Sequence, residues 1–465
     1  MSQPGPYENL PLPDGTSVPL YLITFDKEGR LQSPLTLQAL LARVDGGDFT
    51  DVHVFSHGWN NVFKDALQLY RGFFGNYFRL RHDRGLNNST SYRPVAVGII
   101  WPSTLLVAPW ESTPKIAAID PGQGDEEASA DAAALASVAD AIRPEDVSRL
   151  YELSERGATF NPAEAKEFAN ILLPVYQQAA GSPQTDADIA NQPAAPAITA
   201  ESLLALWQQM SPAPQTADQE PGFAPDDEES APPPSQIMAA SFLSWLDPRG
   251  PIRVASVLQM KDRAGVVGAR GVGPNITQKL LQMQKARVHL IGHSYGAKVI
   301  LSSLCYQPVA SPAETLLLLE PAISYLCFSG EIDGHGLKGG YRDALNRVRH
   351  PIYSTFSSRD VPLRRLFHLA VIRQSDWGEQ KIAALPPSKF AALGGFGPGG
   401  LASGESQTIV MPESGGAYPA SSAVRVFGID GSNGQIKGHG DVATPYTAWA
   451  HLTLVQNAQS NQVHT

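Results

Sequence analysis

A serine stands between two glycines in the pentapeptide Gly292-His293-Ser294-Tyr295-Gly296. An apolar, β-branched run precedes this pentapeptide, and a segment typical of a helix follows it. A sharp strand-to-helix turn would expose the serine hydroxyl, and glycines two positions away would avoid a clash with the adjoining backbone. The free N–H groups at the start of the helix would face an oxyanion formed there. The pattern predicts that Ser294 is a nucleophile, and a purely structural turn is the alternative.

A serine hydroxyl needs an imidazole to take its proton and a carboxylate to orient that imidazole. Asp360 follows an apolar run in 348–356, which reads as a strand. His439 lies between two glycines after the last predicted strand. Because the carboxyl ends of parallel strands meet at one edge of a sheet, we expect these side chains to lie beside Ser294. Ser294, His439 and Asp360 are therefore the predicted catalytic residues.

Two other acids, Glu320 and Asp333, remain alternatives for the role of Asp360. Three other histidines, His451, His368 and His335, remain alternatives for the role of His439. Glu320 ends the strand predicted directly after the serine, whereas His451 lies inside the closing helix and is expected to pack there. Asp360 could instead cap a loop or pair with Arg359 or Arg364. The side chain of His293 is expected to point away from the reacting atoms.

A second glycine follows a strand early in the chain, in His57-Gly58-Trp59. The carboxyl end of this strand would face the same crevice as Ser294. A glycine lets the backbone approach a reacting carbonyl and aim an N–H group at it, so the segment is a candidate oxyanion hole. The alternative is a tight turn in which His57 satisfies local backbone groups. We expect His57 to fix this loop and not to act as the base.

Alternating strands and helices must position these residues. Predicted strands cover 18–25, 51–56, 94–100, 287–292, 314–322, 348–356 and 423–429, and predicted helices cover 35–44, 63–77 and 445–455. The strands are near-continuous apolar runs of the kind found in parallel sheets with both faces covered. We therefore predict an α/β fold with a doubly wound, mostly parallel sheet. Residues 252–283 are predicted to be mostly helical, with a break near Gly273-Pro274 and glycines that allow close packing.

The composition changes between residues 111 and 245. Polar, acidic or proline-rich linkers are predicted at 122–127, 181–184 and 219–234, and helices at 128–142, 144–155, 162–178 and 200–210. These helices have apolar faces that need to be covered. We predict a core made of residues 1–110 and 246–465 and an inserted helical cap at 111–245 that shapes substrate access. A surface insertion without that role is the alternative.

The overall composition narrows the possible functions. The net charge of −10 over 465 residues, without a basic stripe, argues against a nucleic-acid partner. Cys305 and Cys327 lie in apolar contexts and are expected to be buried free thiols. No His, Asp or Cys cluster has metal-ligand spacing, so neither a metal nor a cofactor is predicted. The sequence has no signal-peptide pattern and no apolar run of membrane-spanning length, so we expect a soluble, cytoplasmic protein without an integral membrane segment.

The pentapeptide around Ser294, the His57-Gly58-Trp59 segment, Asp360 and His439 together resemble the α/β-hydrolase fold family of serine hydrolases, which includes esterases and lipases. The chain is also similar to an uncharacterised microbial group in which Phe-Ser-His-Gly-Trp-Asn-Asn precedes the serine motif. The resemblance covers residues 16–110 and 250–455. It implies an eight-strand-type sheet, a Ser-His-Asp triad, and an oxyanion hole formed by the N–H groups of Tyr295 and of Gly58 or Trp59.

These inferences predict a serine hydrolase that cleaves a carboxylic ester through an acyl-enzyme intermediate. The expected partner is a small-molecule ester or lipid substrate. Lipase, thioesterase, peptidase or amidase activity would use the same triad, so these remain alternatives. A different alternative is a catalytically inactive relative that acts as a binding module.

Overall fold

The computed structural model describes residues 4–59, 61, 63–86, 92–103, 134–136, 138–139, 141–155, 160–181, 198–210, 248–332, 338–360, 363–364, 391–419 and 423–460. The linkers predicted at 122–127 and 219–234 lie outside these ranges, as does most of the helix predicted at 128–142. Three of the residues considered as alternatives for the acid and the base, Asp333, His335 and His368, lie outside them too.

Nine strands of the described chain form one sheet in the order β1-β2-β4-β3-β5-β6-β7-β9-β8. The strands are β1 (Glu8–Pro11), β2 (Ser17–Thr24), β3 (Asp51–Ser56), β4 (Pro94–Ile100), β5 (Arg287–His293), β6 (Thr315–Leu319), β7 (Ile352–Phe356), β8 (Ser406–Val410) and β9 (Val426–Asp430). Only β1 pairs in the antiparallel direction, and the other neighbouring strands are parallel. The predicted α/β class with a mostly parallel sheet is confirmed.

The two edge strands, β1 and β8, were not predicted from the sequence. Each is only four or five residues long, and most of its residues are at least partly exposed. They therefore lack the continuous apolar runs that mark β3 and β6, in which every residue is buried. The sheet accordingly has nine strands among the described residues, one more than the eight expected from the resemblance.

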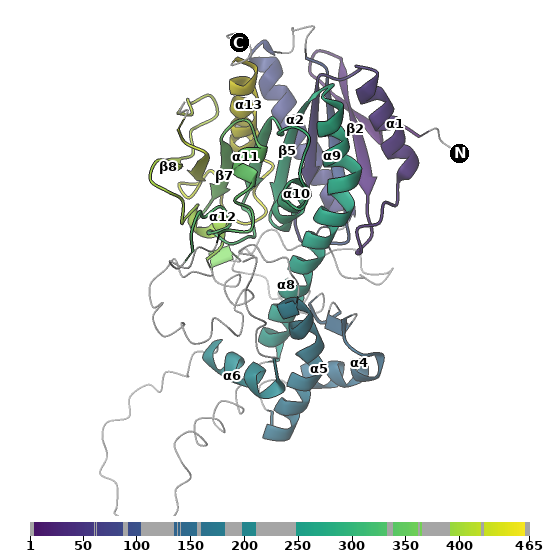
Figure 1. Ribbon diagram of the computed structural model, residues 1–465, viewed down its shortest axis with the longest axis vertical. Coiled ribbons are helices and arrows are strands. Elements are labelled where there is room, and N and C mark those ends of the chain that lie inside the picture. The colour runs from purple at the N-terminus through teal and green to yellow at the C-terminus, as the bar shows by residue number, and fades with distance from the viewer. Residues whose placement is uncertain are drawn as a thin grey trace, which may run out of the picture.

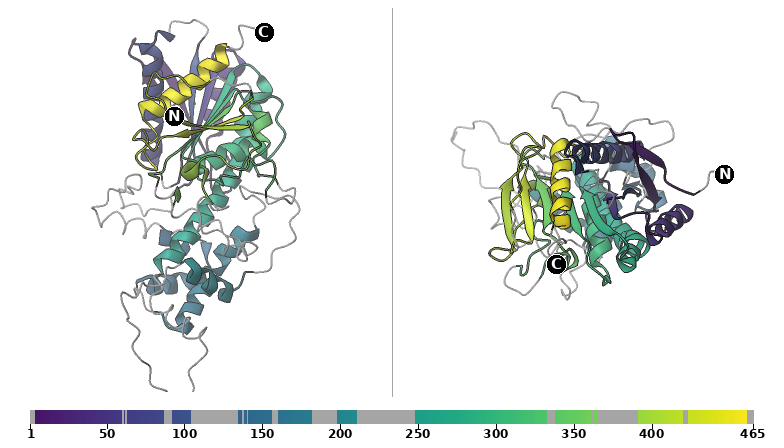
Figure 2. Two further views of the ribbon diagram at one scale, coloured as in Figure 1. Left: turned by 90° about the vertical axis from the view of Figure 1, so that its left-hand side faces the viewer. Right: turned by 90° about the horizontal axis from the view of Figure 1, so that it is seen from above.

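Helices pack on both faces of the sheet (Figures 1 and 2). One face is covered by α1 (Pro34–Asp45), α10 (Tyr295–Cys305) and neighbouring helices, and the other by α2 (Phe63–Asp83) and α13 (Pro445–Ser460). Alternate residues of each strand supply the two cores. Leu316 and Leu318 of β6, for example, join the first core, whereas Leu317 and Leu319 join the second. This alternation explains why central strands read as unbroken apolar runs.

A long helical run leads into the sheet part of the molecule (Figure 1). It consists of α8 (Arg249–Val266), a π-helical stretch η3 (Val267–Thr277) and α9 (Gln278–Met283). The break predicted near Gly273-Pro274 is wrong, because the chain continues through these residues with the wider π-helical turn. The predicted close packing is present. A Cβ on Gly268 would clash with the carbonyl oxygen of Val299 in α10.

The described helices of the 111–245 region pack around a separate apolar cluster. They are a short 3₁₀ turn η2 (Pro144–Asp146), α4 (Val147–Glu155), α5 (Pro162–Gly181) and α6 (Ala200–Met210). As the sequence predicted, Asn161 caps α5, and its Oδ1 accepts the N–H groups of Ala163 and Glu164. The cluster also takes in Ile252 and Ala255, so α8 connects this group of helices to the sheet part.

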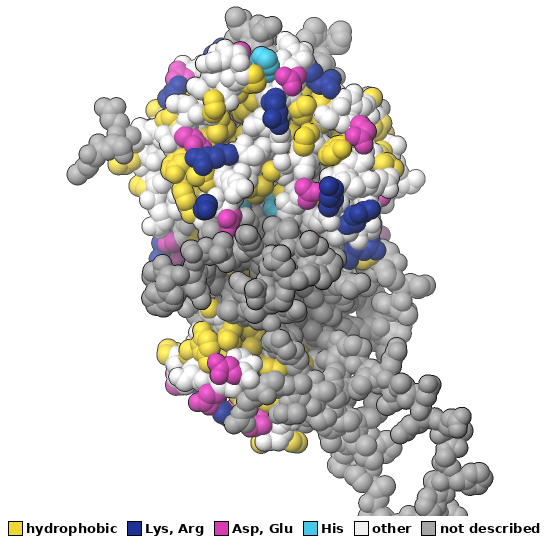
Figure 3. Space-filling model, turned by 180° about the vertical axis from the view of Figure 1, so that it is seen from behind, with side chains coloured by type: hydrophobic (Ala, Val, Ile, Leu, Met, Phe, Trp, Pro, Cys, Tyr) yellow, Lys and Arg dark blue, Asp and Glu magenta, His cyan; other side chains and the backbone are white. Residues whose placement is uncertain are grey.

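On the face shown in Figure 3, Lys and Arg side chains are interspersed with Asp and Glu side chains over the sheet part. Within the described ranges, no helix is both long enough and apolar enough to span a membrane. Cys305 and Cys327 are free thiols; Cys327 is buried and Cys305 is half-buried.

Candidate functional site

Ser294 lies in a strained turn between β5 and α10. Its φ of 54° and ψ of −125° are unusual for a residue with a side chain. The glycines two positions away make the turn possible. A Cβ on Gly292 would come within 2.6 Å of the Cα of Ala297, and one on Gly296 would clash with the carbonyl oxygen of Ser56. The N–H group of Ser294 donates to the carbonyl of Leu319 over 3.0 Å, which fixes the turn against β6.

The structure brings Ser294, His439 and Asp360 together at the carboxyl edge of the sheet. The Nε2 of His439 lies 2.7 Å from the Oγ of Ser294, and its Nδ1 lies 2.7 Å from the Oδ2 of Asp360. Because the carboxylate can only accept, Nδ1 carries the proton and Nε2 is left to accept the serine proton. The side chain of Asp360 is fully buried, whereas that of His439 is 19% exposed.

Asp360 is held as a carboxylate by the donors around it. Its Oδ1 accepts the N–H group of Leu363 over 2.9 Å. Burial alone would raise the pKa of Asp360, but the nearby His439 and these hydrogen bonds outweigh burial and lower the pKa below its ordinary value. The arginines considered as ion-pair partners donate elsewhere, Arg359 to the carbonyl of Ser432 and Arg364 to that of Gly395.

The other described candidates for the acid and the base do not contact Ser294. Glu320 is fully buried at the end of β6, where its carboxyl group accepts the hydroxyl of Thr355. His451 is buried in α13 and is hydrogen-bonded to His53. The sequence predicted that His451 packs inside its helix, and its full burial confirms this.

The expectation for His293 is wrong. Its side chain does not point away from the site but lies against His439, with 5.1 Å between the ring centroids. The Nε2 of His293 lies 2.8 Å from the backbone carbonyl oxygen of His439 and donates to it. Burial lowers the pKa of His293 to about 3, so the ring is neutral at neutral pH. The histidine of the serine motif thus holds the loop that carries His439.

The His57-Gly58-Trp59 segment lies directly beside Ser294. A Cβ on Gly58 would come within 2.5 Å of the Cβ of Ser294. The ring of His57 stacks on Trp101, and its Nδ1 donates to the carbonyl of Gly58 over 2.9 Å. Burial lowers the pKa of His57 to about 4, so it stays neutral. His57 therefore contacts its own loop, in the arrangement expected from the sequence, while Tyr295 begins α10 on the other side of the serine.

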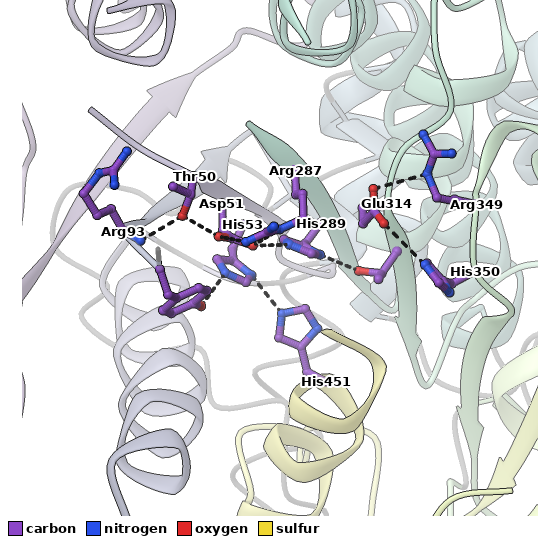
Figure 4. A network of polar contacts seen from close by, with 12 residues as sticks. Thr50, Asp51, His53, Arg93, Arg287, His289, Glu314, Arg349, His350 and His451 are labelled. Carbon is purple, nitrogen blue, oxygen red and sulfur yellow. Dashed lines mark hydrogen bonds and ion pairs between the residues drawn. The ribbon is translucent and has the colours of Figure 1, made fainter. Parts of the chain in front are cut away.

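A second polar cluster lies near the amino ends of the central strands β3 and β5, away from Ser294 (Figure 4). It was not predicted from the sequence. Asp51 and Arg287 are the first residues of β3 and β5, and their side chains form a two-point ion pair in which Asp51 is buried and Arg287 is 22% exposed. Two positions further along each strand, His53 and His289 are paired in register and stack with centroids 4.6 Å apart. We define these four residues and His451 as the histidine cluster.

The ring nitrogens of His53 and His289 all have hydrogen-bond partners, whereas Nδ1 of His451 is buried without one among the described residues. His289 is hydrogen-bonded to Asp51 over 3.0 Å and to Thr315 over 2.9 Å, and His53 is hydrogen-bonded to His451 over 3.0 Å. Burial, together with neighbouring positive groups, lowers the pKa of both His53 and His451 well below the ordinary value. Among the described residues, no group of three or more His, Cys, Asp or Glu side chains is arranged to hold a metal ion. The sequence signal that could have predicted this cluster is a histidine at the third residue of two apolar strands, His53 in β3 and His289 in β5.

No protein-family model, curated protein or solved structure matches this chain.

Proposed function

We propose that this chain is a serine hydrolase of the α/β-hydrolase type that cleaves a carboxylic ester. The observation that carries the proposal is the unbroken hydrogen-bonded series Ser294–His439–Asp360, with both contacts at 2.7 Å. A neutral imidazole between a serine hydroxyl and a buried carboxylate is the arrangement that activates serine. The strained φ of Ser294 supports the same proposal, because such strain is concentrated at functional sites.

The first half of the reaction forms an acyl-enzyme. The Oγ of Ser294 attacks the ester carbonyl while its proton passes to the Nε2 of His439. Asp360 stabilises the resulting imidazolium through the Nδ1 contact. When the tetrahedral intermediate collapses, the bond to the leaving alcohol breaks and His439 returns the proton to that alcohol.

The second half releases the acid. Water gives a proton to His439 and its oxygen attacks the acyl carbon. The bond to the Oγ of Ser294 then breaks, and the serine recovers its proton from the imidazolium. In both halves the oxyanion would be held by the N–H groups of Tyr295 and of Gly58 or Trp59, because Gly58 lies against the serine.

The division of the chain follows from the same proposal. Residues 1–110 and 246–465 would form the hydrolase core, and residues 111–245 a helical cap over substrate access. The separate apolar cluster of α4, α5 and α6 supports the cap, because these helices pack together and onto α8. The substrate would be a small-molecule ester or a lipid, with water as the second reactant.

A fluorophosphonate probe tests the proposal directly, because it phosphonylates only activated serines. The wild-type protein should be labelled, Ser294→Ala should not, and the surface variant Ser154→Ala should be labelled like wild type. Hydrolysis of p-nitrophenyl esters of increasing chain length would then give the acyl preference. Absence of labelling in the folded wild-type protein would overturn the proposal in favour of a binding module.

A further inference from the structure

Glu320 is a fully buried acid next to the candidate site, without a role in the reaction proposed above. It follows the last residue of β6 and has a φ of 43°, which is unusual for a residue with a side chain. The preceding carbonyl, of Leu319, accepts the N–H group of Ser294, and the N–H group of Ala322 donates back to the carbonyl of Ser294. Glu320 is therefore part of the segment that supports the serine turn.

The two oxygens of the Glu320 carboxyl group have different surroundings. The hydroxyl of Thr355 donates to Oε1 over 3.1 Å, and the same hydroxyl oxygen accepts the N–H group of Glu320 over 3.0 Å. Oε2 is buried and has no hydrogen-bond partner among the described residues. The carboxyl group of Glu320 interacts electrostatically with that of Asp360. Because ionised carboxylates only accept, a hydrogen bond between them can form only when one of the two acids carries a proton.

The surrounding donors decide which acid carries that proton. Asp360 accepts from the Nδ1 of His439 and from the N–H group of Leu363, which favours its charged form. Glu320 has a single neutral hydroxyl donor on its side chain. Burial raises the pKa of Glu320 well above its ordinary value, and the negative charges of Asp360 and Asp430 raise it further. Both the donors and the neighbouring charges favour a proton on Glu320 and a charged Asp360.

We propose that Glu320 is a positioning residue, a neutral acid whose O–H group donates to Asp360 and completes the donors around that carboxylate. This role rests on the proposed function, since it acts on the reaction through Asp360. A donor on a third side fixes the rotation of the carboxylate, so that Oδ2 faces the Nδ1 of His439. An ionised glutamate at the same place would instead add a second negative charge beside His439.

Glu320→Gln and Glu320→Leu separate these roles. The Gln amide can still accept from Thr355 and donate to Asp360 without carrying a charge, so its labelling rate with the fluorophosphonate probe should stay within about threefold of wild type. Glu320→Leu removes the donor, and its maximal labelling rate should fall roughly tenfold or more at unchanged probe affinity. Thr355→Val, which removes the hydroxyl but leaves the acid, should have a smaller effect than Glu320→Leu.

The pH profile of the labelling rate gives the decisive comparison. If Glu320 is neutral, the acid limb of the Glu320→Gln profile coincides with that of wild type. If Glu320 is ionised, the substitution removes a negative charge that stabilises the imidazolium, and the acid limb moves to lower pH. A shift of half a pH unit or more in that direction would overturn the proposal.

An infrared difference spectrum of wild type against Glu320→Gln at neutral pH does not depend on activity. It should show the loss of a protonated-carboxyl band, and the loss of carboxylate bands instead would overturn the proposal. Should Glu320→Leu fail to fold, the Gln variant still decides the question by both measurements. A wild-type protein that folds but is not labelled would refute the proposed function, while the spectrum would still test whether Glu320 is protonated.

Discussion

The Nε2 of His293 donates a hydrogen bond to the backbone carbonyl oxygen of His439 over 2.8 Å, although the two residues are 146 positions apart in the sequence. His293 directly precedes Ser294, so the residue beside the candidate nucleophile also holds the loop of the candidate base. The distance between Ser294 and His439 therefore depends on a contact within the site and not only on Asp360. This contact leads to the first prediction.

His293→Phe keeps the ring volume but removes the donor. We expect the free energy of unfolding to fall by about 1–3 kcal/mol, because the carbonyl of His439 loses its hydrogen-bond donor. The labelling rate should fall roughly tenfold, since the His439 loop is held less well. His293→Gln, whose amide can donate, should recover most of both losses. Equal losses in the Phe and Gln variants would contradict this role for the hydrogen bond.

Asp360→Asn should lower the labelling and hydrolysis rates by roughly 10³ to 10⁴-fold. The amide N–H group of Asn would donate to Nδ1 of His439, which forces the proton to Nε2 and leaves no acceptor for the serine proton. The matched control is Asp343→Asn, which breaks only a surface ion pair with Arg347 and should keep wild-type rates. A rate loss of less than tenfold in Asp360→Asn would show that another group orients His439.

Gly58→Ala should abolish most of the labelling. The added Cβ would lie 2.5 Å from the Cβ of Ser294, so either the loop or the serine must move away. We expect a loss of roughly 100-fold or more in rate, together with a lower melting temperature. Gly75→Ala is the control, because a Cβ at that position in α2 meets nothing within 4 Å. Wild-type rates in Gly58→Ala would exclude close approach of this loop to the reacting atoms.

The stability of the protein should decrease as the pH falls below about 6.5. His53 and His451 have pKa values well below the ordinary value when folded, and the pKa values of His57 and His293 are lowered to about 4 and about 3. The unfolded chain takes up these protons first, so the stabilisation is complete above the unfolded pKa and is lost as the pH falls toward the folded values. Each histidine contributes up to about 1.4 kcal/mol per pH unit.

Urea unfolding between pH 8 and pH 5 measures this dependence. His451→Leu should be less stable at pH 8, because Nδ1 of His53 loses its hydrogen-bond partner while Nε2 keeps Tyr92. Its free energy of unfolding should also fall less steeply as the pH is lowered. A free energy of unfolding that stays constant from pH 8 to pH 5 would contradict the lowered pKa values, because it would mean that the folded and unfolded states bind the same number of protons over this range.

The sequence predicted the strands and helices that are marked by a local pattern of residues. The buried runs of β3, β5 and β6 follow from continuous apolar residues, and the start of α5 follows from the Asn161 cap. The order of strands and glycines also predicted that Ser294, Asp360 and His439 would share one edge of the sheet. The structure brings them within hydrogen-bonding distance, and their catalytic roles stay predictions.

Other features were decided by tertiary structure alone. The edge strands have no apolar run of their own, and the π-helical path through Gly273-Pro274 depends on packing against α10. The direction of His293, the contact of Glu320 with Asp360 and the stacking of His53 on His289 depend on strand order and register. A local pattern reports whether a residue is buried and which backbone conformation it prefers. Which side chain meets it across the sheet is determined only when segments far apart in the sequence pair and pack.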